Sequence, residues 1–207
     1  MTLMPAPIVL RDDDPRLPGL LAEGWTVVAE SWGARLRVTP QALRHCFGVL
    51  AAAREQGWVV RELGPDDVAA IVDLDSRCLP DYPVTPQNGH DVPDEAALRA
   101  DLAASTAWAW GALGADGTLV GVTVLRVAGA LVDTDFTAVD AGARRRGLAS
   151  AVKAAAVLGL AGRGHTMFGS GGAADNLAAR RANEAVGYTV TERWLSLRPL
   201  AREGERP

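Results

Sequence analysis

The stretch Val139-Asp-Ala-Gly-Ala-Arg-Arg-Arg-Gly-Leu-Ala149 joins a predicted strand to a predicted helix. The first turn of any helix leaves backbone N–H groups without partners, and the helix dipole adds partial positive charge there. Such a turn binds anions, phosphates above all. Gly147 has no Cβ and lets a ligand approach the backbone closely. Three arginines before a helix oppose its dipole, so we expect an anionic ligand to offset their charge.

Other interpretations of this turn are limited. The chain has no Gly-Lys-Ser/Thr nucleotide loop and no Gly-x-Gly-x-x-Gly dinucleotide signature. The remaining alternative is three arginines solvated at the start of a helix, with no ligand.

Outward from the turn, the pattern predicts an α/β fold of the α+β type, a mixed sheet with helices on its faces. The predicted strands are 58–63, 107–113, 118–128, 130–139, 165–168, 188–191 and 194–200. The predicted helices are one opening at Gly64-Pro-Asp-Asp and ending at Pro80, and those over 94–104, 147–161 and 175–186.

The first part of the chain, 1–57, predicts a hairpin-plus-helix extension. Residues 1–19 are typical of an irregular arm, and the pattern around Gly33 predicts a hairpin of two short strands. Thr39-Pro40 starts a helix that ends at Gly57.

One internal similarity concerns this extension. Gly24-Trp-Thr-Val-Val-Ala-Glu-Ser-Trp32 matches Gly187-Tyr-Thr-Val-Thr-Glu-Arg-Trp194 with one gap. Either two edge segments are alike by chance, or 1–57 is the remnant of a truncated second copy of the domain over 58–200. The last residues, 201–207, are expected to form a disordered tail.

Composition excludes several classes of partner. The 207 residues carry a formal net charge of −4, which disfavours nucleic-acid binding. No signal peptide or membrane-length apolar stretch is visible, so a cytoplasmic protein with no membrane partner is expected. The two cysteines have no metal-ligand spacing, and no metal is expected. Lys153 is the only lysine, which we interpret as compositional bias.

Two motifs together resemble a known family. Val139 to Ala149 resembles the V-x-x-x-x-R-x-x-G-x-G/A signature of the GNAT acetyltransferase superfamily, and Asn176 to Tyr188 is similar to its downstream N-x-x-A-x(7)-G-F/Y segment. The resemblance covers about 58–200 and implies a GNAT-like fold that binds acyl-coenzyme A, with acetyl-CoA as acyl donor. In such a fold the strand ending at Val139 separates from the strand near Phe168, and the pantetheine arm lies between them. The implied CoA-binding residues are Ala138, Val139, Arg144, Arg145, Arg146, Gly147, Leu148, Ala149, Ser150 and Asn176.

The chemistry needs a base, because an ammonium group must lose a proton before it attacks a thioester. Asp133 and Asp135 share one face of the strand 130–139 with Thr137 and Val139. In some family members a glutamate at the place of Asp133 acts as base, so Asp133 is the first candidate and Asp135 the second. Alternatively, both are solvent-facing or bind the substrate amine.

The sequence departs from the family pattern at one position of the late helix. Many members place a catalytic tyrosine seven residues after the first Asn of the late helix, where this chain has Asn183. In the run Gly147 to Lys153 and in the Asn176…Asn183 spacing, the chain resembles a bacterial subgroup that has Asn in place of that Tyr. An amide is not an acid, so Asn183 would hydrogen-bond the sulfur, or water would protonate it. Asp81, Tyr82 and His90 lie in the segment that covers the acceptor site in this fold, and would select a cationic amine.

The predicted function is an N-acyltransferase that moves an acetyl group from acetyl-CoA to a primary amine of a small molecule, by direct attack in a ternary complex. A catalytically weak acyl-CoA-binding regulatory protein is the alternative, and an interaction module built on 1–57 is a third. The sequence leaves open whether the chain forms a homodimer.

Overall fold

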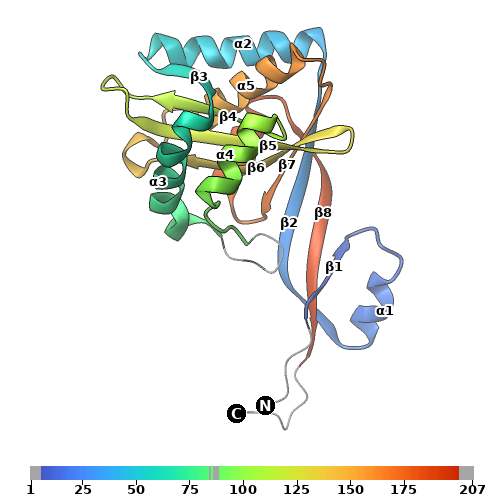
Figure 1. Ribbon diagram of the computed structural model, residues 1–207. Coiled ribbons are helices and arrows are strands. Elements are labelled where there is room, and N and C mark those ends of the chain that lie inside the picture. The colour runs from blue at the N-terminus through green and yellow to red at the C-terminus, as the bar shows by residue number, and fades with distance from the viewer. Residues whose placement is uncertain (1–5, 84, 86–88, 201–207) are drawn as a thin grey trace.

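The computed structural model describes residues 6–83, 85 and 89–200. The expected tail over 201–207 lies outside the described residues. One mixed eight-stranded sheet runs through the molecule in the order β1-β8-β2-β7-β6-β5-β4-β3 (Figure 1). The strands are β1 Ile8–Arg11, β2 Trp25–Arg37, β3 Val59–Leu63, β4 Ala107–Leu113, β5 Leu119–Ala128, β6 Leu131–Val139, β7 Met167–Ala173 and β8 Thr189–Pro199. The mixed α/β fold expected from the sequence is confirmed.

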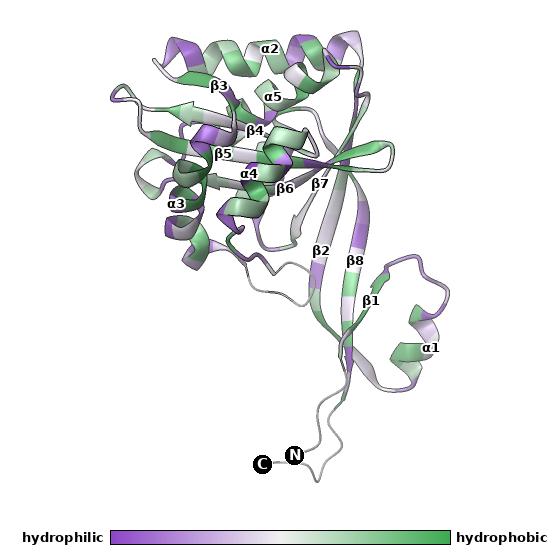
Figure 2. Ribbon diagram, viewed as in Figure 1, coloured by the Kyte–Doolittle hydropathy of each residue, from purple (hydrophilic) through white to green (hydrophobic). Residues whose placement is uncertain are grey.

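Helices cover both faces of the sheet. They are α1 Leu17–Ala22, α2 Pro40–Glu55, α3 Val68–Cys78, α4 Glu95–Ala104, α5 Leu148–Ala161 and α6 Leu177–Glu184, with short 3-10 turns at Pro65–Asp67, Leu79–Asp81 and Ala141–Ala143. α2 and α5 pack together over one face, while α3 and α4 cover the other. Each face therefore has its own hydrophobic core, and the apolar strands between them appear in Figure 2.

The predicted hairpin around Gly33 is wrong, because β2 is one continuous strand. It pairs antiparallel with β7 on one side and with β8 on the other. Gly33 makes no turn. A Cβ there would lie 2.7 Å from Glu192 Oε2, so the glycine allows a close approach between β2 and β8.

Three other expectations also need correction. The segment 1–19 is not wholly irregular, since β1 pairs with β8 and α1 begins at Leu17. The expected short strand at 165–168 continues to Ala173, because β2 pairs with β7 along its whole length. The two expected closing strands are one strand, β8, because it pairs antiparallel with β2 along its length.

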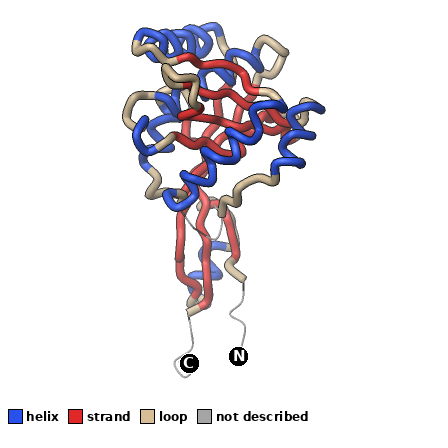
Figure 3. The backbone as a smooth tube through the Cα atoms, turned by 60° about the vertical axis from the view of Figure 1, so that its left-hand side comes forward, coloured by secondary structure: helices blue, strands red, loops and turns tan. Residues whose placement is uncertain are grey.

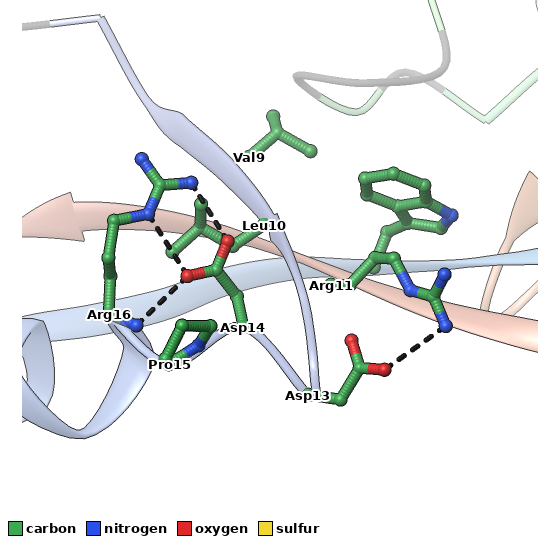
Figure 4. A pocket seen from close by; sticks show the side chains of 8 residues that line it. Val9, Leu10, Arg11, Asp13, Asp14, Pro15 and Arg16 are labelled. Carbon is green, nitrogen blue, oxygen red and sulfur yellow. Dashed lines mark hydrogen bonds and ion pairs between the residues drawn. The ribbon is translucent and has the colours of Figure 1, made fainter.

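The long β2–β8 ribbon leaves the main body and carries β1 and α1 at its far end (Figure 3). The two segments of the repeat noted in the sequence pair with each other in equivalent positions. Trp32 pairs with Arg193, and Trp194, which matches Trp32 in the repeat, pairs with Ser31. A hollow beside β1 lies at this end, and its charged groups pair with one another, Arg11 with Asp13 and Arg16 with Asp14 (Figure 4). None of the residues that the sequence predicted for the site lines it.

β6 and β7 form the one parallel pair of strands among the described residues, and they separate soon after they meet. Only Val132↔Phe168 and Asp133↔Gly169 are paired. Just beyond them β6 carries a bulge, because Leu125 and Val124 of β5 face Thr134 and Phe136 and leave Asp135 unopposed. A gap therefore opens between β6 and β7 and widens toward Val139.

Candidate functional site

The turn between β6 and α5 exposes its backbone as the sequence predicts. Arg145 and Gly147 both adopt the left-handed conformation, with φ of 62° and 77°. Gly147 is followed by the right-handed helix α5, and a left-handed residue next to a right-handed one turns successive N–H groups toward one concave surface, which attracts anions. Nothing lies within 4 Å of a Cβ built on Gly147, so the space in front of this turn is open.

The arginines of the turn have different neighbours. Arg144 Nε donates to Val139 O at 3.0 Å, and Arg144 Nη2 lies 2.6 Å from Asp81 Oδ2. The guanidinium of Arg146 lies 5.8 Å from the centre of the Trp58 ring. Arg145 is exposed. Arg144 thus braces the turn against the segment carrying Asp81, and Arg145 and Arg146 remain nearer solvent.

The edge of β6 that borders the gap carries backbone groups of alternate residues. Asp140 N donates to Val120 O of β5, so alternation turns the Val139 groups toward the gap and the Ala138 groups toward β5. Val139 O already accepts from Arg144, and Cys78 Sγ lies 3.5 Å from it. Burial raises the pKa of the Cys78 thiol, which keeps it uncharged beside this carbonyl.

α6 contributes two asparagines beside α5. Asn176 caps the helix, because its side chain accepts from Ala179 N at 3.0 Å. Asn183 is buried, and its Nδ2 donates to Ala179 O at 2.9 Å. Its Oδ1 is buried without a hydrogen-bond partner among the described residues. Ser150 of α5 donates to Ala182 O at 3.3 Å and joins the two helices.

These features fit an acyl-CoA in three places. The open turn at Gly147 suits a pyrophosphate, and the gap beside Val139 suits an extended arm that pairs like an added strand. The buried Asn183 Oδ1 lacks the hydrogen-bond donor that such an oxygen needs.

The two candidate bases have different surroundings. Asp135 is exposed at the bulge, and its carboxylate lies 2.8 Å from Arg126, which also binds Asp101. Asp133 is partly buried beside the paired end of the gap. Burial raises the pKa of Asp133, against the opposing charges of Arg35 and Lys153. A carboxylate with a raised pKa is the better proton acceptor near neutral pH.

Gly169 of β7 lies against Asp133, a contact that the sequence does not predict. Gly169 alternates with buried Phe168 and Ser170, and a Cβ on it would meet the Asp133 carboxylate. On the neighbouring strands, Arg35 Nη2 lies 2.7 Å from Glu192 Oε1, and Trp194 Nε1 donates to Glu192 Oε2 at 3.1 Å. Glycine at the alternate positions 169 and 171 was the available signal, because it fits a strand that continues past residue 168.

The predicted acceptor residues do not form one group. Tyr82 donates to Asp75 Oδ1 at 2.9 Å, and His90 Nε2 lies 2.7 Å from Asp75 Oδ2. The Tyr82 and His90 rings stack at 4.3 Å, and His90 also contacts Phe136 of β6. Asp81 instead faces Arg144. Asp75 is fully buried and was absent from the sequence analysis, because it lies on the apolar side of a predicted helix.

Lys153 is a second charged group that the sequence analysis left without a role. It lies on the inner face of α5 and is buried. Its Nζ lies 3.2 Å from Ser170 Oγ and 3.3 Å from Thr134 Oγ1. Both hydroxyls lie one residue beyond the last paired positions of β6 and β7, so the amine sits under the apex of the gap.

Comparison with known proteins places the fold. No protein-family model matches the sequence, and no curated protein matches it. Among solved structures, a GCN5-related N-acetyltransferase from Sphaerobacter thermophilus has a TM-score of 0.66, with 17% identity over 93% of this chain and 60% of that one. A GCN5-related N-acetyltransferase-like protein from Streptococcus suis has a TM-score of 0.59, with 15% identity over 92% of this chain and 70% of that one.

A third structure is a tandem GNAT protein from the clavulanic acid biosynthesis pathway, with a TM-score of 0.55 and 16% identity over 92% of this chain and 62% of that one. The chain therefore spans about three-fifths of the length of the first and third of these structures. At these identities the likeness establishes the fold, which is that of the GCN5-related N-acetyltransferases.

The described residues contain neither a membrane-spanning helix nor a cluster of metal ligands. No helix in this part of the chain is long and apolar enough to cross a membrane. No group of three or more His, Cys, Asp or Glu side chains within the described ranges could hold a metal ion.

Proposed function

We propose that this protein is an acetyl-CoA-dependent N-acetyltransferase that acetylates a primary amine of a small molecule by direct attack in a ternary complex. One observation carries the proposal: β6 and β7 separate immediately before an open, anion-attracting turn that starts α5. The shared fold supports the same conclusion.

The chain's own residues divide the task of holding the donor. The N–H groups around Gly147 and Leu148 would bind the pyrophosphate, helped by Arg145 and Arg146, while Arg144 holds the turn in place. The Val139 N–H would pair with the arm in the gap and, near the reacting end, stabilise a developing oxyanion. When bound, acetyl-CoA supplies an acyl group activated as a thioester.

Asp133 is the proposed base. It lies at the narrow end of the gap, where β6 and β7 are still paired, and its raised pKa suits proton removal from an ammonium group. The Asp133 carboxylate occupies the space over Gly169, and Glu192 adds a second carboxylate close enough to interact with Asp133. These two carboxylates favour a cationic amine. Tyr82 and His90, which hydrogen-bond to Asp75, would contact an acceptor that reaches β6 from the side of Phe136.

Isothermal titration with acetyl-CoA tests the cofactor site. We expect Gly147→Ala to weaken binding about tenfold or more, which corresponds to about 1.4 kcal/mol. The added Cβ enters the open space of the turn, and a left-handed φ strains any residue with a Cβ by roughly 1–2 kcal/mol.

Gly57→Ala is the matched control. Gly57, which follows the end of α2, likewise has a left-handed φ of 86° and nothing within 4 Å of a Cβ. We expect it to lose similar stability but no affinity for acetyl-CoA. Wild-type protein without affinity for acetyl-CoA would contradict the proposed function.

Turnover with a panel of amines separates this function from its alternative. A catalytically weak acyl-CoA-binding regulatory protein would bind acetyl-CoA and acetylate none of them. The accepting oxygen of Asn183, at the place of the family's usual acid, is the feature that favours this alternative.

A further inference from the structure

Lys153 is distinguished first by composition. The chain contains 21 basic residues of the Lys and Arg types, and all but Lys153 are arginine. Within the described ranges, Lys153 is also the one basic side chain that is buried. Arginine stays protonated in proteins, whereas a buried lysine amine readily exchanges its proton. The single lysine of the chain therefore lies at the position where a basic side chain can lose its proton, while the remaining positions carry arginine.

The amine has two hydroxyl neighbours at the apex of the gap, and they differ in how their hydrogens are used. Thr134 Oγ1 donates to Gly169 O at 3.1 Å, so its hydrogen is committed. Ser170 Oγ accepts from Lys153, and no acceptor for the Ser170 hydrogen is recorded among the described residues. Of the two hydroxyls, Ser170 is free to donate into the gap.

The proposed reaction needs an acid to protonate the leaving sulfur, and Lys153 and Ser170 can supply that proton. Asn183 presents an oxygen that accepts hydrogen bonds and cannot protonate a leaving thiolate. We propose that Ser170 protonates the leaving sulfur of the acyl donor and that Lys153, behind it, resupplies the proton. This relay rests on the acyl transfer proposed above and names the acid that the reaction lacks.

The protons of the relay balance. The substrate ammonium first loses one proton, which passes through Asp133 to solvent. The neutral amine nitrogen then bonds to the acyl carbon and loses a second proton to Asp133, while the carbon–sulfur bond breaks with its electron pair on sulfur. Ser170 gives its hydroxyl proton to that sulfur and takes one from the Lys153 ammonium. Lys153 is then a neutral amine, and the proton on Asp133 returns to it through solvent. Asp133 is close enough to Lys153 for their charges to interact.

The surroundings of Lys153 permit this exchange. Burial lowers the pKa of Lys153 to about 7, and the negative charge of Asp133 opposes that shift. The other ionisable groups facing the apex are Tyr188, whose ring centre lies 5.8 Å from Nζ, and Cys46 of α2, which lies close to Tyr188. Burial raises the pKa of Tyr188 and raises that of Cys46 to about 11, so both are neutral near pH 7. Asn183 of α6 is uncharged, and β4, behind α5, has no ionisable residue.

A single NMR signal reports on the amine directly. Because Lys153 is the only lysine, isotope-labelled lysine gives one side-chain resonance in the full-length protein. We expect it to titrate near neutral pH in the free protein, and to shift when CoA is added. A resonance that remains that of an ammonium group well above neutral pH, with or without CoA, would overturn the relay.

Kinetics of variants give the second test. We expect Lys153→Met and Ser170→Ala to lower kcat on the order of 100-fold, the range of general acid catalysis, while acetyl-CoA affinity changes less than about threefold. The wild-type kcat should fall as pH rises above neutral, because Lys153 loses its proton, and Lys153→Met should lack that fall. Ser196→Ala, which removes another buried serine of the sheet, should retain wild-type kcat.

The outcomes separate the two proposals. Wild-type turnover that survives in Ser170→Ala and in Lys153→Met overturns the relay alone. Wild-type protein that does not bind acetyl-CoA overturns the proposed function and the relay with it. If Lys153→Met does not fold, Ser170→Ala and the NMR titration still decide, because neither removes the lysine.

Discussion

At the scale of the residue, burial of Lys153 ties the stability of the fold to pH. An unfolded chain keeps this amine protonated up to a pKa of about 10.4, whereas in the fold its pKa is about 7. Between these values the unfolded state binds more protons, so the free energy of unfolding rises with pH.

We therefore expect the stability of wild-type protein, relative to Lys153→Met, to increase from neutral pH toward pH 10, by at most about 1.4 kcal/mol per pH unit. Urea denaturation of both proteins across this range measures it. The difference between them removes contributions from cysteine and tyrosine. A flat difference would mean that the amine is charged in the fold.

Asp75 is the second residue whose burial has a measurable consequence. It is fully buried, and each of its carboxylate oxygens has one partner, Tyr82 or His90. We expect Asp75→Asn to destabilise the fold by about 2–4 kcal/mol, because it breaks a buried network that then cannot be fully satisfied.

Tyr82→Phe provides a graded comparison in the same denaturation experiment. It removes one hydrogen bond, and we expect a loss of about 1 kcal/mol. If Asp75→Asn costs no more than Tyr82→Phe, the carboxylate is not the centre of this network.

At the scale of the element, α2 depends on the residue that caps its N-terminus. Thr39 adopts an extended conformation and accepts from Ala42 N at 3.1 Å, and Pro40 follows at the first helical position. We expect Thr39→Ala to lower the free energy of unfolding by about 1 kcal/mol. Thr191→Ala, at an exposed position of β8, is the control and should cost less. Equal losses would show that the cap contributes nothing specific.

Elements with local signals could be predicted from the sequence. Thr39-Pro40 predicted the start of α2, and in the structure Thr39 and Asp94 both cap their helices by accepting from a backbone N–H group. The α5 turn was predictable because glycine, arginine and the end of a strand act within a few residues.

Elements fixed by distant partners could not be predicted. β2 was expected to turn at Gly33, yet pairing with β7 and β8 on both sides keeps it extended. The glycines of β7 carry little strand preference and are ordered by the same neighbour. The same holds for the proposed site: a motif predicted Gly147 and Arg144, whereas the contacts of Asp75 and Ser170 depend on residues far away in the chain.

At the scale of the whole molecule, the β2–β8 ribbon relates the two ends of the chain. Trp32 of β2 and Trp194 of β8 occupy equivalent positions, because exchanging the two strands leaves their pairing unchanged. The neighbours are also equivalent, since β1 pairs with β8 and β7 pairs with β2. We infer that the segment carrying β1, α1 and β2 is the remnant of a second copy of the domain. A relative with an intact second copy, in which the equivalents of β1 and α1 continue the same register, would support this origin.

Deletion of residues 1–38 should therefore abolish folding, and not merely remove an appendage. β2 supplies Trp32, Ala34 and Leu36 to the core and separates β7 from β8. We expect the remaining chain to show no cooperative thermal transition and to bind no acetyl-CoA. A folded, CoA-binding truncation would show instead that the first segment is dispensable.

The insertion of β2 between β7 and β8 also constrains the order in which the protein is made. During synthesis β2 emerges well before β8, its partner along most of its length. Pairings so distant in sequence slow folding, and unpaired strand edges in the meantime favour aggregation. The nascent chain thus carries an incomplete sheet until β8 has been synthesised, and its yield in a cell will depend on how well unpaired β2 is shielded from other chains.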